Sequence, residues 1–97
     1  MTGEFISAQR GFDLGLVNAL VDTDDLVPTA LDYAHKIGAC APLGLAACKE
    51  LVRLAVTDPA SVSDRMAHWQ SVVFTSDDAI EGATAFVEKR EPRWKGR

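Results

Sequence analysis

Residues 42–56 read PLGLAACKELVRLAV, and this stretch decides the fold of the 97-residue chain. Pro42 suits the first turn of an α-helix, so we predict a helix over 42–56. Its apolar arc covers about 220°, where an ordinary surface helix shows about 100°. A helix this apolar needs cover on two sides: a small bundle supplies one, and the other needs another chain or a further domain. The two faces are Leu43, Ala47, Leu51 and Leu54, and Leu45, Cys48, Val52, Ala55 and Val56.

Helical spacing recurs on both sides of this stretch. We predict further helices over residues 8–14, 25–38, 59–74 and 76–90, and one short strand over 16–21. A single strand has no partner in this chain, which leaves its backbone groups unpaired on both edges. The predicted fold class is therefore mainly α, with about five helices and at most one short strand. The helix over 59–74 has a core or interface stripe made of Val62, Met66, Trp69 and Val73.

Local signals mark several helix ends. Ser7 is predicted to cap the first helix, and Gly15, which adopts positive φ easily, is predicted to end it. Pro28 fits only in a first turn, so the second helix is expected to begin near residue 27. Asp77 and Asp78 open the last helix, where we interpret them as capping residues.

The charge of the chain is unevenly distributed. The net charge is −4, yet residues 1–88 carry thirteen acidic and five basic side chains, and residues 89–97 carry one acidic and five basic. A basic end on an acidic body suggests either a site for an anion or a solvated tail. Trp94 within this tail either stacks on a purine or covers the edge of the core. The cations that could bind phosphate oxygens are Lys89, Arg90, Arg93 and Lys95.

Most other site classes find no support. The sequence contains no phosphate-binding loop, no dinucleotide fingerprint and no nucleophile elbow. Cys40 and Cys48 are eight residues apart, which suits neither a redox pair nor a zinc site, so we expect reduced thiols and no metal. The acidic body opposes nucleic-acid binding. No apolar run is long enough for a membrane span and the N-terminus lacks a basic region, so we expect no membrane partner and a cytoplasmic location.

Two long motifs are similar to those of a known family. MTGEFISAQRGFDLGLVNALV (residues 1–21) and SDDAIEGATAFVEKREPRWKGR (residues 76–97) resemble the C-terminal region of the crotonase superfamily, the enoyl-CoA hydratases and isomerases. The motifs occur in the family's order and at its separation, so the resemblance covers the whole chain. It implies a junction segment over residues 1–22, which follows a catalytic core, and a C-terminal helical trimerisation region over residues 23–97.

The resemblance also limits the expected activity. In the family, two backbone N–H groups that form an oxyanion hole and, in hydratases, two glutamates lie in upstream motifs that have no counterpart here. We therefore expect no catalytic residue, an inactive isolated chain, and a piece of a longer enzyme or a truncated product. The intact enzyme would hydrate 2-enoyl-CoA thioesters in fatty-acid or related acyl-CoA metabolism, although isomerases, decarboxylases and thioesterases share this region.

The resemblance assigns two contacts to bound coenzyme A. Phe86 would line the acyl or pantetheine tunnel, and Lys89 would pair with a phosphate of CoA; otherwise Phe86 is a core residue and Lys89 a solvated helix end. CoA thioester is then a substrate, and no cofactor is required. The expected partners are acyl-CoA and further copies of the chain, as a trimer or a dimer of trimers. The alternative is a non-catalytic helical module for oligomerisation or interaction.

Overall fold

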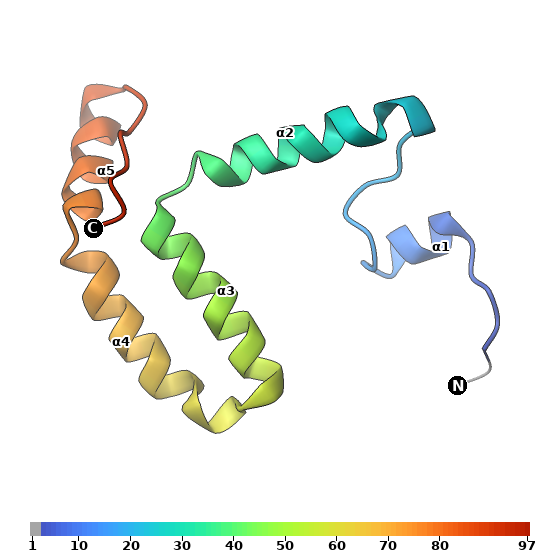
Figure 1. Cartoon of the computed structure of the whole chain (residues 1–97), viewed down its shortest axis with the longest axis horizontal. Coiled ribbons are helices and arrows are strands. Elements are labelled where there is room, and N and C mark those ends of the chain that lie inside the picture. The colour runs from blue at the N-terminus through green and yellow to red at the C-terminus, as the bar shows by residue number, and fades with distance from the viewer. Residues whose placement is uncertain (1–2) are drawn as a thin grey trace. The chain divides into compact units, whose positions relative to one another are not determined.

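The computed structural model describes residues 3–97, so Met1 and Thr2 of the predicted junction segment lie outside it. The chain divides into two compact units, Met1–Ala34 and His35–Arg97. The predicted boundary between residues 22 and 23 concerns an intact protein and stays a prediction. The described residues confirm a mainly α fold (Figure 1), with helices α1 Ala8–Asp13, α2 Leu26–Gly38, α3 Pro42–Thr57, α4 Val62–Phe74 and α5 Asp77–Glu88.

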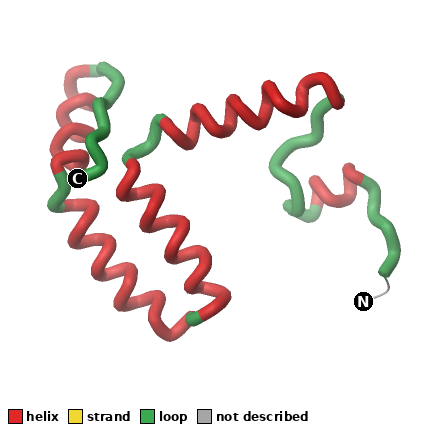
Figure 2. Tube along the Cα trace, in the orientation of Figure 1, coloured by secondary structure: helices red, strands yellow, loops and turns green. Residues whose placement is uncertain are grey.

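The strand predicted over residues 16–21 is wrong. Residues 16–22 form bends and irregular chain, drawn as loop in Figure 2. Gly15 has φ of +73° and closes α1, and the N–H of Leu16 then bonds back to the carbonyl of Gly11 at 2.9 Å. The first residue of the predicted strand is thus part of a helix end. Among residues 3–97 there is also no strand to pair with it.

The first unit confirms the local end signals. The hydroxyl of Ser7 accepts the N–H of Arg10 at 3.1 Å, which caps α1. A 3₁₀ turn over Thr23–Asp25 leads into α2, where Pro28 lies in the first turn as expected. Leu26 is 60%, Tyr33 41% and Ile37 55% exposed, so the apolar stripe of this helix is exposed along its whole length.

In the second unit, α3 and α4 form an antiparallel hairpin with a 3₁₀ turn, Pro59–Ser61, at its tip (Figure 1). The first predicted face of α3 lies against α4, with Ala47 only 7% exposed. The second face is open, because Val52 is 70% and Val56 84% exposed. The hairpin therefore covers one side of α3 and leaves the other without cover.

An ion pair and a tryptophan that bonds to it join the two helices of the hairpin. Glu50 of α3 pairs with Arg65 of α4, with Nη2 and Oε2 3.1 Å apart, and the indole N–H of Trp69 donates to the same carboxylate at 3.0 Å. The bonds from Arg65 hold the pKa of Glu50 below its usual value of 4.5. Glu50 is thus a structural anion, and Trp69 lies at the helix interface, as its stripe predicts.

The basic tail is an ordered part of the fold. Residues Pro92–Arg97, here called the C-terminal strap, run back along α5 toward its first turn (Figure 2). Asp78 of that turn is 3% exposed, and its carboxylate accepts the backbone N–H groups of Lys95 at 2.7 Å and Gly96 at 2.8 Å. Ser76, which accepts the N–H of Ala79 at 3.0 Å, is the cap of α5. Asp78 therefore anchors the strap instead of capping the helix.

A second carboxylate fixes the start of the strap. Glu81 receives two bonds from the guanidinium of Arg90, at 2.6 and 3.0 Å, and a third from the backbone N–H of Arg93 at 2.7 Å. Arg90 and the N–H of Arg93 lower the pKa of Glu81 from 4.5 to about 2. The folded chain thus binds a proton at Glu81 less readily than the unfolded chain does.

This difference makes stability depend on pH. Glu81 stabilises the fold fully above its unfolded pKa of 4.5, and its contribution is lost as the pH falls from there to about 2. We expect the midpoint of urea unfolding, followed by circular dichroism, to fall through this range. Glu81→Gln should be less stable at neutral pH and show a flatter profile.

Glu91→Gln is the matched control, because the Glu91 carboxylate makes no ion pair among the described residues. It should keep the wild-type profile. Identical profiles for Glu81→Gln and the wild-type chain would contradict a stabilising role for the Glu81 carboxylate.

Candidate functional site

The two residues predicted to contact CoA lie at the C-terminal end of α5. Phe86 is 86% exposed, so it is not the core residue that the alternative interpretation describes. Lys89 directly follows the last residue of the helix. The two residues are three positions apart, with Phe86 in the last turn of α5 and Lys89 just beyond it.

Lys89 has an unusual backbone conformation. Its φ of 54° and ψ of 41° place it in the left-handed region. Its N–H bonds to the carbonyl of Phe86 at 3.3 Å, and the N–H of Arg90 bonds to that of Ala85 at 3.1 Å, which is the pattern of a helix closed by glycine. A lysine in this conformation costs about 1 kcal/mol relative to glycine. Strain of this kind is concentrated at functional positions, although it does not by itself identify one.

The structure separates Lys89 from Arg90 and Arg97, the two cations of the basic end that form ion pairs. The Arg90 guanidinium is held by Glu81 and by Glu88, whose carboxylate lies 2.6 Å from it, and these bonds raise the pKa of Arg90 above its ordinary value. Lys95 lies in a pocket beside acidic side chains. Within residues 3–97, by contrast, neither the Lys89 ammonium nor the Arg93 guanidinium has an ion-pair partner. Lys89 is therefore available for an anion, and Arg90 is already neutralised.

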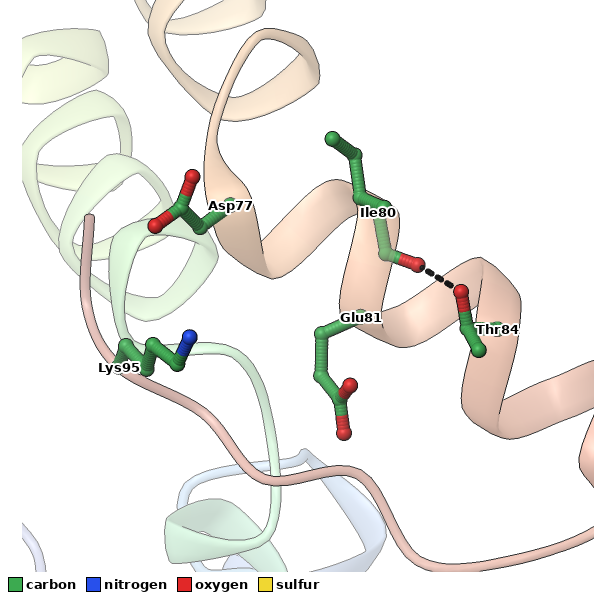
Figure 3. Close-up of a pocket in the computed structure, with 5 residues that line it drawn as sticks. All are labelled: Asp77, Ile80, Glu81, Thr84 and Lys95. Atoms are coloured by element: carbon green, nitrogen blue, oxygen red, sulfur yellow. Dashed lines mark hydrogen bonds between the residues drawn. The ribbon is translucent and has the colours of Figure 1, made fainter.

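A shallow pocket of about 280 Å³ lies along the other side of α5 (Figure 3). Its lining residues are Asp77, Ile80, Glu81, Thr84 and Lys95, and the hydroxyl of Thr84 donates to the carbonyl of Ile80 at 2.8 Å. The Glu81 carboxylate here is already bound by the guanidinium of Arg90 and by the backbone N–H of Arg93. Neither Phe86 nor Lys89 lines this pocket, so it is not the predicted CoA contact.

Three of the four described glutamates of the second unit have structural partners, and Glu91 is the exception. Glu50 binds Arg65 and Trp69, and Glu81 and Glu88 bind Arg90. An acid–base pair of free carboxylates is thus not assembled from them. Within the described part of the chain, no three metal-ligating side chains are grouped, and no helix has both the length and the apolarity that a membrane span requires.

Sequence reasoning missed the residues that organise this end of the molecule. Trp94 donates its indole N–H to the carbonyl of Ala39 at 2.8 Å and lies on Gly82, so it covers the core edge and is not free to stack on a base. The signal was Gly82 itself, because a glycine inside a helix destabilises it and often marks a close approach. Nothing in the local pattern indicates that Asp78 binds a segment seventeen residues away.

Comparisons with known proteins bear on the family and the fold of this chain. The sequence model of the family described as Enoyl-CoA hydratase/isomerase matches residues 1–97. Carnitinyl-CoA dehydratase of Salmonella paratyphi A is 39% identical over 103 residues, which cover 100% of this chain and 39% of that protein. The chain thus spans 39% of the length of this curated relative.

Solved structures give the same result. An enoyl-CoA hydratase from Mycobacterium tuberculosis H37Rv matches with a TM-score of 0.81 and 38% identity, over 99% of this chain and 38% of that one. An enoyl-CoA hydratase from Polaromonas sp. JS666 matches with a TM-score of 0.85 and 35% identity, over 96% of this chain and 37% of that one. The chain described here belongs to the enoyl-CoA hydratase/isomerase family.

Proposed function

We propose that this chain is the C-terminal helical region of a protein that hydrates 2-enoyl-CoA thioesters, and that it contributes contacts to CoA rather than reacting groups. The family match runs along the whole chain, yet the chain covers only 39% of its curated relative. In this proposal, the oxyanion hole and the two catalytic glutamates belong to the remaining length found in the relatives. The CoA thioester is the substrate, and no further cofactor is needed.

The type of reaction in this proposal is taken from the relatives' names. One is a dehydratase of a CoA ester and others are hydratases. Removal and addition of water are the two directions of one reversible reaction, so both names fit the same chemistry. The proposal therefore assigns water addition or removal at a CoA thioester, and leaves the acyl group to residues outside this chain.

The observation that carries the CoA contact is the exposed end of α5. Phe86 presents 86% of its surface to solvent, and burying such a ring against an acyl or pantetheine chain is worth about 1.5–3 kcal/mol. Lys89 lies three residues further on with a strained backbone and an ammonium that forms no ion pair among residues 3–97. An apolar ring followed by a free cation suits a ligand whose flexible chain ends in phosphates.

The isolated chain should not catalyse the reaction. An oxyanion hole lowers the barrier only where its donors are fixed around the thioester carbonyl, and we assign those donors to other parts of the protein. Mixed with crotonyl-CoA, the purified 97-residue chain should show no loss of the enoyl absorbance above the buffer rate. Saturable turnover by this chain would contradict the assignment.

The chain should bind CoA weakly through Lys89. Lys89→Gly removes the ammonium while relieving the left-handed backbone, so a loss of affinity reports the charge and not a damaged helix end. By isothermal titration calorimetry we expect about fivefold weaker binding, the size of an exposed charge pair. Lys89→Arg should retain most of the affinity.

Lys49→Ala is the matched control, because Lys49 is an exposed lysine on α3 with no ion pair among the described residues. It should bind CoA as the wild-type chain does. Equal binding by Lys89→Gly and the wild-type chain would remove Lys89 from the site.

We also propose that the chain associates with further copies of itself. The specific observation is the open face of α3, where Val52 is 70% and Val56 84% exposed. Contiguous apolar surface of this kind marks an interface in proteins that are otherwise polar outside. This role as an oligomerisation module is compatible with CoA contact, and it is the alternative function if CoA does not bind.

The open face can be tested by adding charge to it. Val52→Lys and Val56→Lys change exposed residues, so the monomer should stay folded while association weakens. Light scattering should show a mass above 10.5 kDa for the wild-type chain and a lower mass for these variants. Ala46→Lys adds the same charge to the polar face of α3 and should leave the mass unchanged. A wild-type chain that is monomeric at all concentrations would contradict the proposal.

A further inference from the structure

The orientation of α5 is not explained by helix packing alone. α4 packs extensively along α3 but meets α5 much less extensively. An apolar pocket of about 450 Å³ lies among α3, α4 and α5, and Trp94 of the strap is part of its lining. Close-packed helices would leave no opening of this size. Another part of the molecule must therefore fix α5 in the second unit.

Trp94 joins α5 to the segment that precedes α3. Its ring lies over Gly82 so closely that a Cβ there would be 3.2 Å from Cη2 and 3.3 Å from Cζ3. Its indole N–H donates to the carbonyl of Ala39 at 2.8 Å. One side chain thus connects the middle of α5 to the segment between α2 and α3.

Asp78 fixes the other end of the strap. Its buried carboxylate accepts the N–H groups of Lys95 and Gly96, and its own N–H donates to the carbonyl of Arg97 at 3.3 Å. Gly96 has φ of +72°, which turns the chain back so that a Cβ there would be 3.8 Å from Pro42, the first residue of α3. The strap therefore meets α3 at its start and α5 along its first half.

We propose that the C-terminal strap, held by Asp78, Gly82 and Trp94, sets the orientation of α5 relative to the α3–α4 hairpin, and that these three act as positioning residues for Phe86 and Lys89. The claim about positioning Phe86 and Lys89 rests on the proposed CoA contact, whereas the claim about the orientation of α5 stands without it. Asp78 and Gly82 join α5 to the strap. Trp94 and Gly96 then join the strap to Ala39 and Pro42, and Trp94 lines the apolar pocket. Loss of the strap removes the connection that directly spans that pocket.

The first experiment measures the orientation itself. Spin labels are placed at Lys49→Cys on α3 and Val87→Cys on α5, both exposed positions, in a chain with Cys40→Ser and Cys48→Ser. Pulsed dipolar spectroscopy should give a narrow distance distribution. Gly82→Ala and Trp94→Phe should broaden or shift it while circular dichroism still reports helices.

Gly44→Ala is the matched control, because Gly44 also lies inside a helix but a Cβ there meets nothing within 4 Å. It should leave the distribution narrow. An unchanged distribution in folded Trp94→Phe would overturn the proposal, and this variant still decides the matter if Gly82→Ala does not fold.

The second experiment tests positioning by a double-mutant cycle on CoA affinity. Lys89→Gly should weaken binding about fivefold in the wild-type background, and less than twofold in the Trp94→Phe background. Equal effects in both backgrounds would mean that Trp94 stabilises the fold without positioning Lys89. That result would overturn the claim that the strap positions the CoA-contacting residues. If Lys89→Gly has no effect in either background, the CoA contact fails, and the distance measurement still decides the role of the strap.

Discussion

The buried Asp78 carboxylate is the constraint on which this end of the molecule depends. A charge that is 3% exposed is stable only when its oxygens are satisfied, and both receive backbone N–H groups from the strap. If the strap detached, Asp78 would lose both partners, and the two N–H groups would lose their acceptors. The penalty couples the last residues of the chain to the first turn of α5. A segment whose composition suggests a solvated tail is thereby part of the folded structure.

The helices could be predicted from the sequence because their signals are local. Pro42 at the start of α3, Ser7 at a cap and Gly15 in a left-handed turn each act within a few residues. The strand over 16–21 was predicted from apolar character alone. In the structure, its first residue, Leu16, instead bonds to Gly11 in the turn that closes α1. The partner of Asp78 could not be predicted, since spacing along the sequence does not report contacts across the fold.

The candidate site, like the fold, could be predicted only in part from the sequence. Phe86 and Lys89 were identified by resemblance. The structure adds that the Phe86 ring is exposed, that the Lys89 ammonium has no ion pair among the described residues, and that the Lys89 backbone is in the left-handed region that favours glycine. Arg90, which looks equivalent to Lys89 in the sequence, is neutralised by two glutamates. Charge counting treats the basic end as one cluster, whereas the geometry pairs Arg90 with two glutamates and gives Lys89 no ion pair within residues 3–97.

The close approach of Trp94 to Gly82 has a consequence for how related sequences can diverge. A Cβ at position 82 would lie 3.2 Å from the ring, so the ring of Trp94 would have to move by a few tenths of an ångström to accept it. A relative with a larger residue at 82 would accommodate it most easily with a smaller or displaced residue at 94, and a relative without the indole no longer requires the glycine. Substitutions at positions 82 and 94 are therefore expected to be coupled.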